Sequence, residues 1–124
     1  MNFKERAMLE LEKAKQLLRD FEALSAQDIK NIIFFLMNAL NFGVSYLQRD
    51  ATDVETDFYV LNVNRSTKRD MCELYFFLKN LSSKDFRKAG RDAVTANGWK
   101  NSVFLKKSYF EELVKRVQRL LESL

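Results

Sequence analysis

The residues best suited to chemistry in this sequence are cations that gather about two-thirds of the way along it. Four of them, with one polar side chain that follows, form the candidate site: Lys84, Arg87, Lys88, Arg91 and Asn97. Steps of four and three separate Lys84, Lys88 and Arg91, which places their charges on one face if the segment is helical. Such a face attracts phosphate groups or an acidic partner, although a solvated charged face has the same composition.

The sequence lacks the histidine that usually accompanies such an arginine in catalysis. An arginine near a helix end can act together with a histidine in proton transfer, and the chain contains no histidine. The single cysteine, Cys72, is expected on a buried helix face and is a poor nucleophile without a basic neighbour. The carboxylates of residues 50–57 lack the glycine and the spacing of a calcium loop. We therefore expect no metal, no cofactor and no enzymatic activity.

Further cations and aromatic residues accompany this site along the chain. The additional basic clusters are Arg65, Lys68, Arg69 and Lys100, Lys106, Lys107, and the interleaved aromatic residues are Tyr75, Phe86, Trp99 and Tyr109. Bases can stack on aromatic rings while phosphates contact cations, which is the general mode of single-strand binding. Residues 1–64 carry a net charge of −3 and residues 65–124 a net charge of +7. The C-terminal half is therefore expected to face an anionic ligand or an acidic partner.

The elements that must position these residues follow from composition and periodicity. The chain has 124 residues, no proline and three glycines, which favours a single domain (1–124) built from long helices. Apolar residues at helical spacing predict helices at about 3–23, 26–48, 67–80 and 109–123. Ser25 and Asp28 are suited to the start of the second helix, and Ser108 with Glu111 forms a capping-box pattern at the start of the last.

A shorter helix at about 83–97 is predicted for the candidate site itself. Asn97-Gly98 is suited to end this helix, because glycine tolerates the left-handed conformation of a helix end. Trp99 and Phe104 are then expected as buried anchors in a linker. Residues 58–63, FYVLNV, have the composition of a strand but no evident partner, so we expect an extended segment. The predicted fold class is all-α, an up-and-down bundle of four long helices plus one shorter helix.

The helix predicted at 26–48 is apolar nearly all round and should be covered on several sides. Its excess apolar surface predicts a homodimer, because exposed patches of this kind usually mark contacts. The apolar stretch 32–47 is shorter than the roughly twenty residues of a membrane span and contains polar residues. The N-terminus has no signal-peptide pattern. Together with the single cysteine, these features favour a cytoplasmic protein with no membrane contact.

The order of these elements resembles that of the HEPN domain, a small helical module associated with nucleotides and RNA. The similar features are LEKAKQLLRDFEAL in the first helix, IKNIIFFLMNALNFGVSYL in the second, and a late arginine-containing helix before a final amphipathic one. The family's ribonuclease motif is an arginine, a polar residue, several further residues and a histidine. Arg91-Asp92 is similar to the start of this motif, but Ala96, Asn97 and Gly98 stand where the histidine would fall.

The resemblance implies a non-catalytic member of the family. Members of this kind bind nucleotide or RNA, or accompany a minimal nucleotidyltransferase in a toxin–antitoxin-like arrangement, and they form homodimers. An alternative is a small helical subunit that lines the RNA backbone in an RNA-guided defence complex, and a third is a helical scaffold that binds no anion. A discrete dimer in solution favours the first alternative, and multimerisation along RNA favours the second.

Overall fold

The computed structural model describes residues 1–57 and 67–124. Within these ranges the chain forms four α-helices, one short 3-10 helix and three strands. Their bounds are α1 Phe3–Arg19, η1 Phe21–Ala23, α2 Ala26–Gln48, α3 Thr67–Ser82, β1 Asp85–Lys88, β2 Ala93–Asn97, β3 Ser102–Lys106 and α4 Lys107–Glu122. The fold is mostly helical, as predicted, but it is not all-α. The predicted extended segment 58–63 and Arg65 lie outside the described residues.

α2 has its predicted bounds, whereas α1 ends at Arg19, before the predicted end near residue 23, and η1 follows it. Steps of four, three and four separate the buried residues of α1, which are Ala7, Leu11, Ala14 and Leu18. α2 begins at a capping box, in which Ser25 Oγ accepts a hydrogen bond from the Asp28 N–H and the Asp28 carboxylate accepts one from the Ser25 N–H. α2 is the most apolar helix, yet no helix in the described part of the chain is long and apolar enough to cross a membrane.

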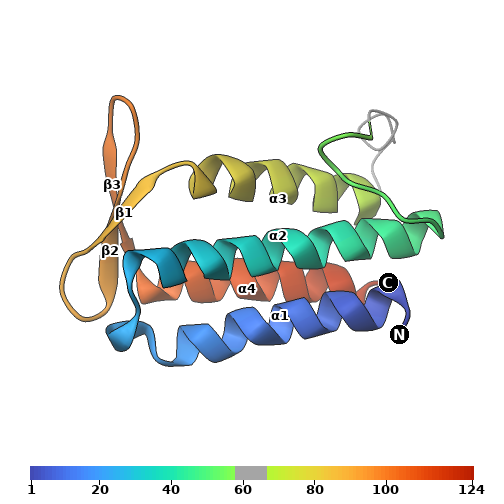
Figure 1. The fold of residues 1–124 in the computed structure, drawn as a ribbon, viewed down its shortest axis with the longest axis horizontal. Helices are drawn as coiled ribbons and strands as arrows, with labels where there is room; N and C mark the ends of the chain where they lie inside the picture. Colours follow the sequence, from blue (N-terminus) through green and yellow to red (C-terminus); the bar gives the residue numbers. More distant parts are fainter. Residues whose placement is uncertain (58–66) are drawn as a thin grey trace.

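α2 is the central helix and contacts α1, α3 and α4 (Figure 1). Gly43 permits this close approach, because a Cβ atom there would lie 3.0 Å from Leu121 Cδ2 of α4 and 3.1 Å from Met71 Sδ of α3. α4 packs more extensively against α1 than against α3. The buried residues of the four helices and of the sheet form one hydrophobic core.

The segment predicted as a fourth, shorter helix forms an antiparallel sheet in the order β1-β2-β3. This sheet lies across one end of the bundle, and the turn of the β2–β3 hairpin projects past α3 (Figure 1). Both chain termini lie at the opposite end (Figure 1). The helix predicted at 83–97 is therefore wrong, and the candidate site has a different geometry from the one expected.

The error arose because the spacing of charges suggested a helix where the apolar residues alternate. Phe86 in β1, Ala96 in β2 and Leu105 in β3 are all buried, and the strand register places them on the face toward the bundle. Gly90 has a φ of 89°, which no right-handed helix contains, and it lies in the turn between β1 and β2. Gly98, the expected helix end, lies in the β2–β3 turn and does not have a positive φ.

α4 begins directly at the end of β3. Its N-cap residue is Lys106, and no side chain caps the helix, so the predicted capping box of Ser108 and Glu111 is wrong. The tertiary structure sets this start, because the Lys107 N–H donates a hydrogen bond of 2.6 Å to the carbonyl oxygen of Asp92 in the β1–β2 turn. The first residue of α4 is thereby tied to the sheet.

Candidate functional site

The structure separates the residues that were predicted to share one cationic face. Arg87 and Lys88 are neighbours in β1, so their side chains point to opposite faces of the sheet. Lys88 Nζ lies 4.3 Å from the centre of the Phe21 ring and donates a hydrogen bond of 2.8 Å to the Phe21 carbonyl oxygen. Lys88 therefore holds the sheet against η1, while Arg87 lies on the outer face with its side chain 75% exposed.

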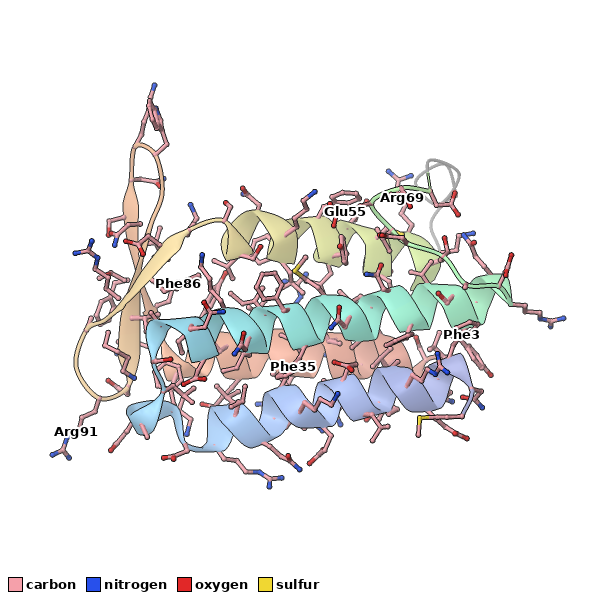
Figure 2. All side chains as sticks on the ribbon, in the orientation of Figure 1. Phe3, Phe35, Glu55, Arg69, Phe86 and Arg91 are labelled. Carbon is pink, nitrogen blue, oxygen red and sulfur yellow. The ribbon has the colours of Figure 1, made fainter. Side chains whose placement is uncertain are left out.

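Of the other three residues of the predicted site, Lys84 and Asn97 lie near each other and Arg91 lies apart from them, because Asp85 pairs with Asn97 and a Cβ atom on Gly98 would lie 2.8 Å from Lys84 Nζ. Lys84 lies in the connection between α3 and β1 and lines a small cavity under the sheet. Arg91 lies in the β1–β2 turn and points away from the bundle (Figure 2). Asn97 ends β2, where its Oδ1 accepts a hydrogen bond of 2.6 Å from Ser102 Oγ. A single helical face of cations is therefore wrong, but Arg87 and Arg91 remain exposed at the end of the molecule.

The outer face of the sheet places an aromatic ring in the same row as a cation. Thr95 in β2 pairs with Arg87 on one side and with Phe104 on the other, so the three side chains share one face. Phe104 is 58% exposed. Asp85 Oδ2 lies 3.3 Å from Arg87 Nε, and both side chains are open to solvent. An exposed pair of this kind holds its partners weakly, so Arg87 can exchange Asp85 for another anion.

The turn of the β2–β3 hairpin carries the most exposed aromatic residue of the described chain. Trp99 is 94% exposed, in a turn closed by a hydrogen bond of 2.8 Å from the Gly98 N–H to the Asn101 carbonyl oxygen. The expectation that Trp99 and Phe104 are buried anchors is wrong. The hairpin projects past the bundle, so no helix covers its outer face or its turn (Figure 1).

The net positive charge of the protein is concentrated in the sheet and its turns. Residues 84–107 carry seven basic and two acidic side chains, a net charge of +5. The rest of the chain carries 14 basic and 15 acidic side chains, a net charge of −1. One end of the molecule is therefore basic while the remainder is close to neutral, which gives an anionic ligand a preferred direction of approach.

A groove between α1 and α4 adjoins this basic end. Its volume is about 300 Å³, and its lining residues are Lys15, Leu18, Arg19, Lys107, Glu111, Val114, Lys115 and Gln118. Four of these side chains are cationic and one is a carboxylate. Lys107 connects the groove to the β1–β2 turn through the hydrogen bond of its N–H to Asp92. The groove and the turn that carries Arg91 thus form adjoining parts of one cationic surface.

Most of the aromatic residues proposed for base stacking are not available. Tyr75 and Phe86 are buried, and Figure 2 shows Phe86 between the sheet and the bundle. Burial raises the pKa of Tyr75, and the hydrogen bond of 2.6 Å from its hydroxyl to Glu55 Oε2 raises it further. Burial also raises the pKa of Tyr109, against the opposing effect of the Arg116 charge. Trp99 alone is exposed among the four, and Phe104 is a second exposed aromatic residue, which the sequence analysis expected to be buried.

Other reactive groups of the described chain have structural roles or are inert. No group of three or more His, Cys, Asp or Glu side chains that could hold a metal occurs in residues 1–57 and 67–124. Carboxylates of residues 50–57 bond within their own loop or to α3: Asp57 accepts a hydrogen bond from Thr52 Oγ1, and Glu55 accepts hydrogen bonds from Tyr75 and Lys79. Burial raises the pKa of the Cys72 thiol to about 11, so it stays protonated at neutral pH.

Comparison with known proteins found no similar protein. No protein-family model, no curated protein and no solved structure matches the chain. The late arginine-containing helix, one of the features behind the resemblance to the HEPN domain, is replaced by the sheet. Membership of that family stays a prediction.

Proposed function

We propose that this protein binds single-stranded RNA across the outer face of its sheet and the turn of the β2–β3 hairpin. The observation that carries the proposal is the exposure of Trp99 and Phe104 within a segment of net charge +5. Large aromatic side chains exposed together usually mark a binding surface. Unpaired bases stack on such rings whatever their sequence, and the cations beside the rings contact the phosphates.

The cationic groove between α1 and α4 gives a longer strand a second set of contacts. Lys107 and Lys115 lie about 12 Å apart along α4, at 1.5 Å per residue. Lys15 and Arg19 face them from α1. Because the groove adjoins the β1–β2 turn, a strand that stacks on the sheet can continue past Arg91 and place its phosphates on these lysines.

The proposed role is binding without cleavage. The chain has no histidine, and the amide of Asn97 cannot exchange a proton at neutral pH. The nucleotidyltransferase partner implied by the HEPN resemblance remains a separate prediction. Multimerisation along RNA, the alternative of a backbone-lining subunit, predicts a stoichiometry that rises with RNA length, whereas the hairpin site predicts a fixed number of proteins per short strand.

Trp99 offers a direct test because it is the only tryptophan of the chain. Stacking of a base on its ring is expected to quench its fluorescence as a short single-stranded RNA is added at low salt. Trp99→Ala and the double variant Arg87→Glu/Arg91→Glu are each expected to weaken binding about tenfold or more, measured by anisotropy of labelled RNA. All three side chains are exposed, so the melting temperature should change little.

The matched control reverses two exposed arginines at the other end of the bundle. Arg6→Glu/Arg49→Glu changes the net charge by the same amount, since Arg6 lies in the first turns of α1 and Arg49 at the end of α2. This control should keep most of the affinity of the parent protein. If the parent does not bind RNA at low salt, or if both double variants lose affinity equally, the proposed site is wrong.

A further inference from the structure

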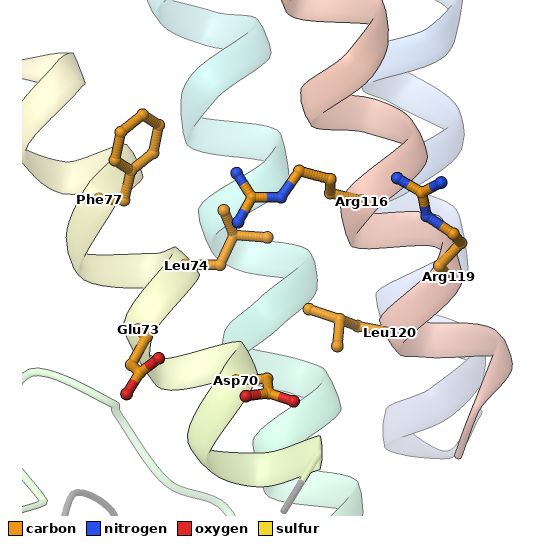
Figure 3. A pocket seen from close by; sticks show the side chains of 7 residues that line it. All are labelled: Asp70, Glu73, Leu74, Phe77, Arg116, Arg119 and Leu120. Atoms are coloured by element: carbon orange, nitrogen blue, oxygen red, sulfur yellow. The ribbon is translucent and has the colours of Figure 1, made fainter.

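A second groove runs along the other side of α4, between α4 and α3 (Figure 3). Its volume is about 420 Å³, and its apolar surface comes from Leu74, Phe77 and Leu120. The groove exists because α3 and α4 both pack on α2 but make few contacts with each other. Phe77 is 45% exposed, so part of the apolar surface is open to water.

The two walls of this groove have opposite charge. Asp70 and Glu73 form the acidic wall on α3, and Arg116 and Arg119 form the basic wall on α4 (Figure 3). The ion pairs of these residues run along each helix, from Arg69 to Glu73 and from Arg119 to Glu112. Among the described residues, no ion pair joins the acidic wall to the basic wall. Both walls therefore present charge to whatever occupies the groove.

The apolar surface continues beyond the charged walls toward the sheet. Phe77 also lines a cavity of about 120 Å³ together with Val103 of β3 and Tyr109 of α4. Val103 is 41% exposed although it points toward the bundle side of the sheet. An uncovered apolar strip thus runs from Leu120 past Phe77 to Val103. A strip of this length, flanked by charges of both signs, has the composition of a protein interface rather than of a small-ligand site.

We propose that the occupant of this groove is a second copy of the chain, related to the first by a two-fold axis that runs along the groove. Such a rotation places α3 of the partner subunit over α4, and α4 of the partner subunit over α3. Each acidic wall then meets a basic wall, and the two apolar strips meet at the centre. A two-fold axis across the groove would instead place acidic wall on acidic wall and basic wall on basic wall, where the like charges repel.

This interface differs from the one that the sequence suggested. α2 was expected to supply the subunit contact, but α1, α3 and α4 cover it, and ten of its residues are buried within the chain. The exposed apolar residues that remain on α2 are Phe34 in its first half and the adjacent Tyr46 and Leu47 near its end. The α3–α4 groove is an uncovered apolar surface separate from the hairpin that carries Trp99 and Phe104. The proposal does not depend on RNA binding.

Variants that reverse the charge of one wall test the proposal, with dimerisation of the full chain measured by sedimentation velocity. The acidic-wall variant Asp70→Lys/Glu73→Lys and the basic-wall variant Arg116→Glu/Arg119→Glu should each dimerise at least about tenfold more weakly than the parent. An equimolar mixture of the two variants should form a heterodimer about as tightly as the parent forms its homodimer, because both wall contacts are again complementary. The mixture also shows that neither variant has lost its fold.

The control reverses two lysines on the other side of the same helix. Lys107→Glu/Lys115→Glu makes the same change in net charge as the basic-wall variant, but both residues line the α1–α4 groove. This control should dimerise as the parent does. The proposal is overturned if the parent is monomeric at high micromolar concentration, if the mixture does not associate, or if the control dissociates as readily as the wall variants. None of these outcomes bears on RNA binding, which the fluorescence of Trp99 measures separately.

Discussion

The two grooves on either side of α4 differ in the sign of their charges more than in their size. The α1–α4 groove, of about 300 Å³, has four cations and one carboxylate, Glu111. The α3–α4 groove, of about 420 Å³, has two carboxylates on one wall and two arginines on the other. Both have apolar residues among their lining residues: Leu18 and Val114 in the first, Leu74 and Leu120 in the second.

This difference indicates what each groove can accept. A surface of one sign is neutralised best by an extended polyanion, whose charges all have the opposite sign. A groove with one acidic and one basic wall is neutralised by its own rotated copy, which needs no other partner. The amphipathic helix α4 can take part in both, because its buried residues lie between two polar flanks that face different neighbours.

The largest expected effect comes from a change beneath the α3–α4 groove. Gly43→Val places carbon atoms against Leu121 of α4 and Met71 of α3, where even a single Cβ would lie at 3.0 to 3.1 Å. Overpacking of this kind should lower the free energy of unfolding by about 1–3 kcal/mol, measured by urea denaturation. Displacement of α3 and α4 from α2 should also weaken dimerisation more than it weakens RNA binding at the sheet.

Gly43→Ala is the control for this change, because one added carbon contacts only flexible side-chain ends. Alanine should be tolerated far better than valine, since it also favours the helix over the unfolded chain. Equal loss of RNA binding and of dimerisation in Gly43→Val would show that the two surfaces of α4 are not separable.

A smaller effect is expected from neutralising the α1–α4 groove. Lys15→Gln/Lys115→Gln should weaken binding of a long single-stranded RNA roughly tenfold at 0.1 M salt, because each lysine neutralises about one phosphate. The slope of log K against log salt should become shallower by about 0.7 per lysine. A strand long enough only for the sheet should bind as before, with the same quenching of Trp99. The measurement is anisotropy of labelled RNA over a salt series.

The matched variant for this prediction is Lys4→Gln/Lys68→Gln. Both lysines are partly buried, like Lys15, and neither lines the groove. If this variant changes the salt slope as much as Lys15→Gln/Lys115→Gln does, RNA does not bind preferentially in the α1–α4 groove. The proposed difference between the two grooves would then be wrong.

The smallest effect concerns how α3 is held on its side away from the α3–α4 groove. Hydrogen bonds from Lys79 and then from Tyr75 lower the pKa of Glu55 below its usual value of 4.5. The stabilisation is therefore present above that value and is lost as the pH falls through the lowered pKa of the folded protein. Glu55→Gln should make the unfolding free energy less dependent on pH below about 4.5, as followed by urea denaturation at several pH values.

If Glu55→Gln also weakens dimerisation at neutral pH, the contact of Glu55 with α3 helps to position α3 and thereby determines the shape of the α3–α4 groove. If dimerisation is unchanged, packing on α2 alone determines the groove. Either result defines which contacts keep the two walls apart.

The helices were readable from the sequence because their determinants are local. The bounds of α2 at 26–48 are confirmed, and its capping box depends on residues only three positions apart, Ser25 and Asp28. The buried residues of α1 follow a spacing that any helix imposes. Phe110 and Val117 of α4 are buried at helical spacing for the same reason.

The sheet and the two grooves were decided by the tertiary structure. Strands of four or five residues gain their hydrogen bonds and burial only from each other and from the bundle beneath, so they leave a weak local signal in the sequence. The helical spacing of Lys84, Lys88 and Arg91 was the stronger local signal, and it predicted a helix. Gly90 was the local sign of a turn that should have counted against a helix. The packing of α1, α3 and α4 around α2 determines which charges face each other across a groove. The spacing of apolar residues within one helix and the composition of that helix do not specify this packing.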